Sequence, residues 1–220
     1  MYTDTIIDSG ERVSGGWRWV DSPGERPASS VPDATTLGTM RHRIKMLMDN
    51  HKKGSRPSLH EKVTDAVKKM AQDSGCVVGK WMLIEPTYKM DEAWKKVKEG
   101  VRSNKLGFSA KMTDGPAGTR VMCIYTYSFL DETDVWRVLQ QLRRMEIFPK
   151  TWKADIMTHI GLYSSKAASL SAGGIYVPGL LMGWFSITGI NKFEESQNPA
   201  EYSSRAQYNI AALNDQPTGL

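Results

Sequence analysis

Cysteine is scarce in this chain of 220 residues, which contains only Cys76 and Cys123. The two lie far apart and form no C-x-x-C pair, so neither a disulfide framework nor a cysteine zinc site is predicted. The first residues also lack a basic segment followed by an apolar one, and we expect no secretory signal. These features indicate a protein of a reducing compartment, the cytoplasm, with the nucleus as the alternative.

Long apolar runs are equally rare. The longest uncharged stretch, residues 174–190 (GIYVPGLLMGWFSITGI), is shorter than the roughly 20 residues that a membrane helix needs. Pro178 and four glycines would also break a helix there. We therefore expect a buried strand or an irregular tail in this stretch, and no membrane association.

Motifs for catalysis are missing too. Residues 75–81 (GCVVGKW) mimic a phosphate-binding loop, but three residues rather than four separate the glycines and Trp81 replaces the Ser or Thr. The four histidines have no metal-ligand spacing. Asp155 and His159 fall in an expected strand, where four residues span about 13 Å, too far for a mutual hydrogen bond. We expect a non-enzymatic protein without catalytic residue, metal or cofactor; an enzyme acting on a phosphorylated small molecule ranks third among the alternatives.

What the sequence does contain is a basic segment. Residues 41–111 hold 17 Lys and Arg against 8 Asp and Glu, whereas the rest of the chain has 12 against 16. Hydrophobic residues make up 40% and charged residues 24%, as in ordinary globular proteins. The basic bias favours a polyanion or phosphate ligand, and the alternative is a set of solvated helix faces.

Three regions differ in composition. Residues 1–40 are rich in Gly, Ser and Pro and show no period, which predicts a flexible N-terminal arm. Trp17 and Trp19 are exceptions within it; we interpret them as packing on the protein's own surface, with stacking on a ligand as the alternative. Residues 41–165 are predicted to form the folded domain, and 166–220 a divergent C-terminal tail to which no function is assigned.

Periodicity predicts an α+β domain. Helices are expected at 58–73, 91–102 and 131–145, and strands at 80–85, 106–113, 120–127 and 152–160. A capping box formed by Ser58 and Glu61 should start the first helix, Gly75 should end it, and Asp91 should cap the second. The tryptophans and the cysteine within these elements are expected in the core: Trp81, Trp94, Trp136 and Cys123. This order predicts a mainly antiparallel sheet with helices on one face, and by itself it matches a ferredoxin-like unit.

Five motifs then suggest a family. GKWMLIEP at 79–86, DEAW at 91–94, LGFSAK at 106–111, CIYTYSF at 123–129 and KADIMTHIGLY at 153–163 occur in this order. Over residues 56–165 the chain resembles the basophilic-leukaemia-expressed protein family. That family looks like initiation factor 4E in fold. The resemblance implies a curved, mainly antiparallel sheet with helices packed on its convex face, and this replaces the ferredoxin-like alternative.

The same resemblance implies a site on the concave face. By position, Lys80 and Lys111 stand where cationic residues of the initiation factor approach the cap phosphates, while Ser109 stands where that factor has an arginine. Strand alternation supports the placement, because Lys80 should point away from Trp81 and Lys111 away from its apolar neighbours. We expect Lys153 and Asp155 to line or rim this face.

These expectations combine into a functional hypothesis. The protein is predicted to be a monomeric binding module that takes RNA or a nucleotide-like ligand through phosphate contacts with Lys80, Lys111 and Lys153, in a role related to translation or mRNA. Trp17 or Trp19 would supply aromatic stacking. The alternative is a protein interaction adaptor whose basic helix faces bind an acidic partner.

Overall fold

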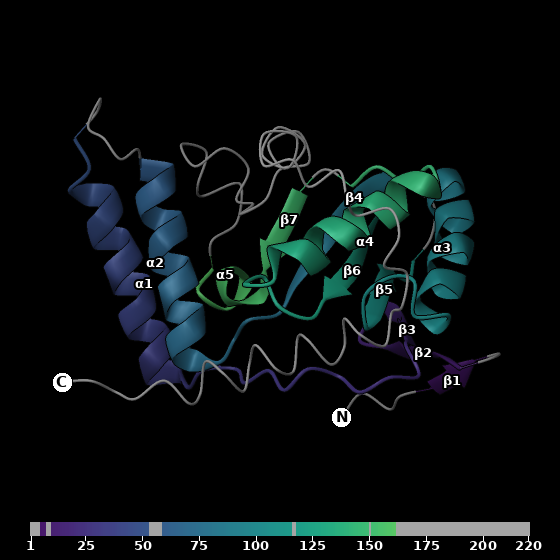
Figure 1. Ribbon diagram of the computed structural model, residues 1–220, viewed down its shortest axis with the longest axis horizontal. Coiled ribbons are helices and arrows are strands. Elements are labelled where there is room, and N and C mark those ends of the chain that lie inside the picture. The colour runs from purple at the N-terminus through teal and green to yellow at the C-terminus, as the bar shows by residue number, and fades with distance from the viewer. Residues whose placement is uncertain (1–4, 8–9, 53–58, 116–117, 150, 162–220) are drawn as a thin grey trace.

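The fold is α+β, as the sequence predicts. The computed structural model describes residues 5–7, 10–52, 59–115, 118–149 and 151–161 (Figure 1). The strands are β1 (Thr5–Ile7), β2 (Glu11–Ser14), β3 (Trp17–Asp21), β4 (Gly79–Pro86), β5 (Ser109–Thr113), β6 (Thr119–Thr126) and β7 (Thr151–Ala154). The helices are α1 (Ala34–Asp49), α2 (Leu59–Ser74), α3 (Thr87–Arg102), α4 (Glu132–Arg144) and α5 (Asp155–His159).

All seven strands belong to one antiparallel sheet in the order β1-β2-β3-β5-β6-β4-β7. Its centre is formed by the predicted strands, with β6 between β5 and β4. The β5–β6 hairpin is confirmed, with Lys111 opposite Cys123. On β4, Lys80 lies opposite Tyr125 on one side and opposite Lys153 on the other. This register places the predicted lysines on neighbouring strands.

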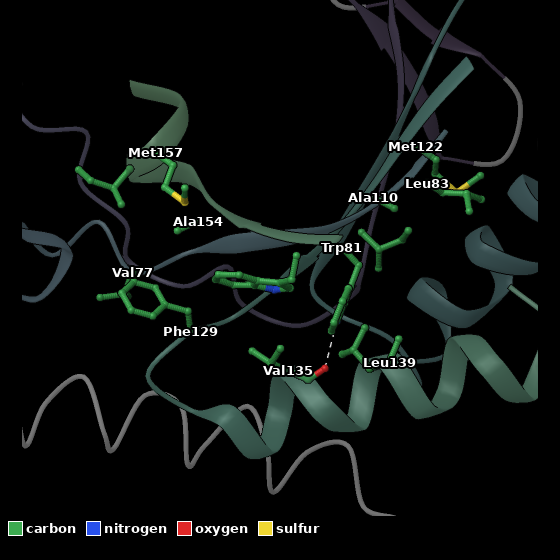
Figure 2. Close-up of a cluster of buried hydrophobic side chains, with 14 of the residues drawn as sticks. Val77, Trp81, Leu83, Ala110, Met122, Phe129, Val135, Leu139, Ala154 and Met157 are labelled. Atoms are coloured by element: carbon green, nitrogen blue, oxygen red, sulfur yellow. Dashed lines mark hydrogen bonds between the residues drawn. The ribbon is translucent and has the colours of Figure 1, made fainter. Parts of the chain in front are cut away.

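One face of the sheet packs against the helices. Trp81 and Trp152 are fully buried there, with Val135 and Leu139 of α4 and Val97 and Val101 of α3 in the same apolar cluster. The indole Nε1 of Trp81 donates a hydrogen bond to the Val135 carbonyl oxygen at 3.0 Å, which joins β4 to the helix below it (Figure 2). The predicted core positions are confirmed, because Trp81, Trp94, Trp136 and Cys123 are all buried.

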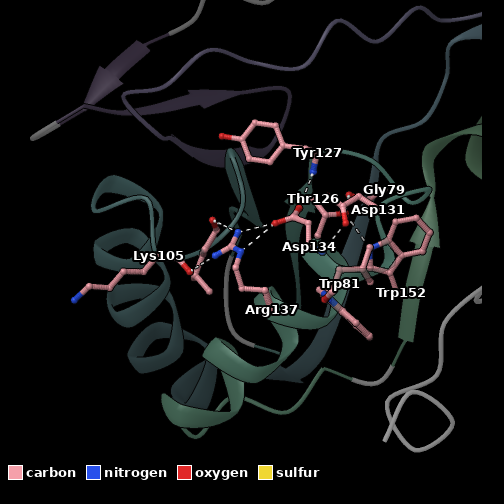
Figure 3. A network of polar contacts seen from close by, with 11 residues as sticks. Gly79, Trp81, Lys105, Thr126, Tyr127, Asp131, Asp134, Arg137 and Trp152 are labelled. Atoms are coloured by element: carbon pink, nitrogen blue, oxygen red, sulfur yellow. Dashed lines mark hydrogen bonds and ion pairs between the residues drawn. The ribbon is translucent and has the colours of Figure 1, made fainter. Parts of the chain in front are cut away.

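A polar network fixes α4 against the ends of the strands. Asp134 is fully buried and accepts hydrogen bonds from the Tyr127 backbone N–H at 3.4 Å and from the Arg137 guanidinium at 2.7 Å (Figure 3). Arg137 in turn donates to the carbonyl oxygens of Lys105 and Leu106, just before β5. A buried carboxylate is stable only when paired in this way. The network therefore holds the start of β5 and the end of β6 in register.

A helical pair lies at one end of the sheet. In Figure 1, α1 and α2 stand side by side, and α5 lies between them and the sheet; α5 contacts α2. Arg41 of α1 donates a hydrogen bond to the His159 carbonyl oxygen at 2.8 Å. Gly75, with φ of 69°, follows the end of α2, as predicted for a left-handed helix stop. Ser58, the predicted cap at the other end, lies outside the described residues.

The prediction of a flexible arm is wrong for the part of residues 1–40 that the structure describes. Three strands form there, Thr5–Ile7, Glu11–Ser14 and Trp17–Asp21, and β3 pairs with β5 along its whole length. Asp33 caps α1, a helix that the sequence analysis misses, by accepting hydrogen bonds from the N–H groups of Thr35 and Thr36. These strands are short, and β3 joins the sheet through pairing with the distant strand β5 rather than through a local apolar pattern.

Two predicted boundaries are also wrong. The second helix begins at Thr87 rather than near Asp91, because the chain passes from Pro86 directly into a helical turn; the Asp91 carboxylate instead binds Arg120. The last strand ends at Ala154 rather than at residue 160. There the Asp155 N–H donates to the Val78 carbonyl oxygen, and the chain turns into α5.

The described residues contain no helix that is long and apolar enough to cross a membrane. The apolar stretch 174–190 and the predicted tail 166–220 both lie outside the described residues.

Candidate nucleic-acid interface

The sheet face opposite the helices brings together every site residue that the sequence predicts. We call Trp17, Trp19, Tyr125, Lys80, Lys111 and Lys153 the cationic face. Trp19 lies opposite Lys111 across β3 and β5, while Lys80 lies between Tyr125 and Lys153. Because side chains alternate along a strand, Lys80 points away from Trp81 and therefore away from the helices. The structure thus places the three lysines on one face of the sheet.

Lys111 lies against three aromatic rings. Its Nζ is 4.4 Å from the ring centroid of Trp17, 4.7 Å from that of Trp19 and 5.7 Å from that of Tyr125. Ammonium groups at such distances are attracted by the negative faces of the rings. Among the residues that the structure describes, no carboxylate forms an ion pair with this lysine. Burial, together with the nearby charge of Lys80, lowers the pKa of Lys111 below its ordinary value.

Lys80 is the most buried of the three lysines, with 7% of its surface exposed. Its ammonium group forms an ion pair with the Asp155 carboxylate and lies 5.5 Å from the Tyr125 ring centroid. Asp155 is held close because its backbone N–H is bonded to the carbonyl oxygen of Val78, at 2.9 Å. The charge of Lys80 is thus balanced within the protein.

Lys153 extends the cationic face to the edge strand β7. It is half-buried and pairs with Lys80 in the register of the sheet. Burial lowers the pKa of Lys153, and the neighbouring Lys80 charge lowers it further. Two ammonium groups on adjacent strands repel each other, so a ligand with several negative charges would relieve this repulsion.

The aromatic part of the face is layered. The Trp19 and Tyr125 rings stack, with centroids 6.1 Å apart and an angle of 14° between their planes. The Arg12 guanidinium lies 4.9 Å from the Trp19 centroid, and its side chain also approaches Asp21 at 3.5 Å. Burial raises the pKa of Tyr125, which keeps its hydroxyl protonated at neutral pH. Trp17 and Trp19 are thus parts of the sheet, held by cations, rather than parts of a flexible arm.

Ser109, which the sequence resemblance placed at an arginine position of the initiation factor, has a structural role. Its hydroxyl is buried and lies within donor distance of two acceptors, the Asp21 carboxylate at 2.7 Å and the Val20 carbonyl oxygen at 3.1 Å. It fastens β3 to β5 and adds no cation to the face. Cys123, beneath Lys111, is buried, and burial raises the pKa of its thiol. It is a packing residue, as predicted.

The sequence analysis did not predict two residues of this site, Tyr125 and Arg12. Tyr125 could have been found, because it alternates with Ile124 on the predicted strand and so shares a face with Cys123. Arg12 gave no signal, since it lies in a segment without periodicity. Its place depends on pairing between β2 and β3, which brings Arg12 opposite Trp19.

The family relationship follows from a match that spans most of these elements. The model of the family described as basophilic leukemia-expressed protein Bles03 matches residues 16–161, more than half of the chain. The chain belongs to the Bles03 family. The Bles03 region begins just before β3 and ends just after α5, so Trp17, Trp19 and the three lysines all fall within it. No curated protein matches the chain.

Proposed function

We propose that this Bles03 family member is a non-enzymatic module that binds RNA or a nucleotide-like ligand through phosphates on the cationic face. The single observation that supports it most is the convergence of Lys80, Lys111 and Lys153, from three strands, beside Trp17 and Trp19. Cations and exposed ring faces in one place are the combination that binds single-stranded nucleic acid. A resident anion is also favoured because burial lowers the pKa of Lys111 and Lys153, and a nearby phosphate would stabilise the charged form of both.

The parts of the face would have separate roles. Lysine ammonium groups would contact phosphate oxygens as point charges, whereas indole rings would stack on bases. Trp17 and Trp19 are both half-buried, so part of each ring is accessible to a ligand. Stacking a base on an aromatic ring contributes about 1 to 3 kcal/mol and tolerates any base. We therefore expect binding with modest base preference and strong dependence on salt.

The sequence resemblance to initiation factor 4E agrees with this proposal. In that comparison Lys80 and Lys111 occupy the positions of phosphate-binding cations. A protein of this kind would act on mRNA or in translation and would work as a monomer in the cytoplasm.

A second candidate function is an adaptor for an acidic protein. Tyr88 on α3 is 74% exposed, and Lys89 and Lys95 are exposed on the same helix. Other lysines of the predicted basic faces are already balanced: Lys98 binds Glu11 at 2.9 Å, and Lys69 binds Asp73 at 3.3 Å. This leaves a smaller basic surface than the sequence predicts, and the adaptor function ranks second.

A binding titration tests the proposed function. Fluorescence anisotropy of a labelled single-stranded RNA would be measured at several salt concentrations, with GTP and a cap analogue as competitors. Log Kd should change with log salt by about 0.7 for each phosphate contact. Lys111→Ala should reduce that slope by about this amount, and Lys80→Ala should reduce it less, because Lys80 is already paired with Asp155.

Lys69→Ala on α2 is the matched control, because it removes one positive charge far from the cationic face. It should leave both affinity and slope near those of the wild type. Unchanged titration curves for both Lys80→Ala and Lys111→Ala would rule out the proposed site. An acidic protein partner that is lost in Lys95→Glu, kept in Lys111→Ala and insensitive to nuclease would favour the adaptor.

A further inference from the structure

We propose that Asp155 makes the cationic face selective for ligands that end in a phosphate monoester. The inference rests on the proposed function and specifies its ligand. Asp155 is an anion supplied by the protein itself, placed on the most buried lysine of the site. A phosphate that binds Lys80 must take the place of this carboxylate.

The geometry makes this competition unavoidable. The Lys80 side chain is only 9% exposed, and the Asp155 side chain beside it is 24% exposed. Asp155 follows directly after β7, and its backbone is fixed by the hydrogen bond to Val78. Its carboxylate therefore stays next to the Lys80 ammonium group, and only a rotation of the Asp155 side chain opens that group to a ligand.

Charge decides which phosphate can displace the carboxylate. An internal phosphodiester has one negative charge, the same as Asp155, so exchanging one for the other on Lys80 gains little. A terminal phosphate monoester has about −1.5 to −2 charges at neutral pH and three acceptor oxygens. It can contact Lys80 and its neighbour Lys153 together, because these residues are partners on adjacent strands. The exchange is then favourable.

Lys111 differs from Lys80 in this respect. It contacts aromatic rings, and no carboxylate among the described residues is paired with it. A phosphodiester can approach Lys111 without displacing a protein anion. The face thus has an aromatic side that accepts any nucleotide and a side around Lys80 that favours a phosphorylated end.

The test compares two RNA oligonucleotides of one sequence, one with a 5′-phosphate and one with a 5′-hydroxyl, with 3′-phosphorylated RNA as a further probe. The wild type should bind a phosphorylated end about tenfold more tightly than the hydroxyl form. In Asp155→Asn, which keeps the shape of the side chain but removes its charge, both RNAs should bind more tightly. The hydroxyl form should gain more, so the preference should shrink to about twofold to threefold.

Two further variants separate a direct effect from general ones. Asp73→Asn on α2 makes the same change in net charge on an exposed helix and should alter neither affinity nor preference. In a Lys80→Met background, adding Asp155→Asn should no longer increase RNA affinity, because the carboxylate acts through Lys80. Thermal unfolding of each variant establishes that it is folded, and Asp155→Ser serves as the uncharged substitute if Asp155→Asn does not fold.

The outcomes are distinct. Suppose that RNA binding is salt-sensitive and depends on Lys111. If it then shows no preference for a phosphorylated end, or a preference that Asp155→Asn leaves unchanged, this inference is overturned and the proposed function stands. Failure of the folded wild type and of the folded Asp155 variant to bind either RNA overturns both. Binding by Asp155→Asn together with a narrowed preference supports the role of Asp155.

Discussion

The same strands present an apolar surface on one face of the sheet and lysines with aromatic rings on the other. Toward the helices, β4 and β6 present large apolar groups such as Trp81, Met122 and Ile124, all fully buried. On the other face the same two strands present Lys80 and Tyr125, in contact with a second, smaller apolar cluster. The helix-facing side buries apolar surface. The cationic face places ammonium groups against aromatic rings. Removing these charges from water costs free energy, so stability alone does not explain this arrangement.

This difference indicates where stability and function reside. Desolvated charges reduce stability, and they cluster where a protein binds ligands. In the cationic face, Lys111 and Lys153 both have pKa values lowered by burial. Substitutions on the two faces should therefore separate the loss of folding from the loss of binding.

The largest effect is expected for Trp81→Ala on the helix side. The substitution removes a fully buried indole, its packing against Leu139 and Val135, and its hydrogen bond to a carbonyl oxygen of α4. The free energy of unfolding should fall by about 3 to 5 kcal/mol. Urea unfolding followed by circular dichroism measures it. A loss below about 1 kcal/mol would contradict the division between the faces.

A smaller loss of stability is expected for Trp19→Ala on the cationic face. The ring is half-buried, stacks on Tyr125 and lies near two cations, so about 1 to 2 kcal/mol should be lost. RNA affinity, in contrast, should fall about tenfold, because a base loses its stacking surface. The RNA anisotropy titration measures the second effect. If folded Trp19→Ala binds RNA as tightly as the wild type, the Trp19 ring serves only in packing.

The smallest effect is a change in the pH dependence of stability in Lys111→Met. Because the pKa of Lys111 is lower in the folded protein than in the unfolded chain, the unfolded state binds more protons between the two values. The penalty for burying this ammonium group is therefore fully present at neutral pH and disappears as pH rises through the lowered pKa toward about 10.4.

Lys111→Met should remove that penalty. We expect its unfolding free energy to exceed that of the wild type by less than about 1 kcal/mol at pH 7, with the difference shrinking by pH 10. Paired urea unfolding curves at the two pH values test this, since other groups cancel in the comparison. A difference that grows with pH would mean that the folded protein stabilises the charged form.

Much of the central fold could be predicted from sequence because its elements have strong local patterns. The strand now observed as β4 is a continuous apolar run, and α3 has Trp94, Val97 and Val101 on one stripe. The C-terminal part was ambiguous for a physical reason. Ile156 and Ile160 are four residues apart, a spacing that places both on one face of either a strand or a helix. The structure forms the helix α5 at this point.

The candidate site was predicted only in part. The resemblance to the initiation factor pointed to Lys80 and Lys111, and strand alternation assigned them to a face without knowledge of the partner strand. The contacts around them depend on register, and no local pattern specifies which distant strand will lie beside β5. For this reason neither the approach of Trp17 and Trp19 to Lys111 nor the ion pair between Lys80 and Asp155 could be derived from the sequence.

The pairing of β3 with β5 has a consequence for the order in which the chain matures. The Ser109 hydroxyl reaches the Val20 carbonyl across 89 residues of sequence. Because a chain is synthesised from its N-terminus, β3 leaves the ribosome long before its partner exists, and it must wait while the β5–β6 hairpin forms locally. Until β3 arrives, β5 presents a row of unpaired backbone groups on which another nascent chain could add a strand. When β3 pairs with β5, it therefore completes the cationic face and covers an aggregation-prone edge at the same time.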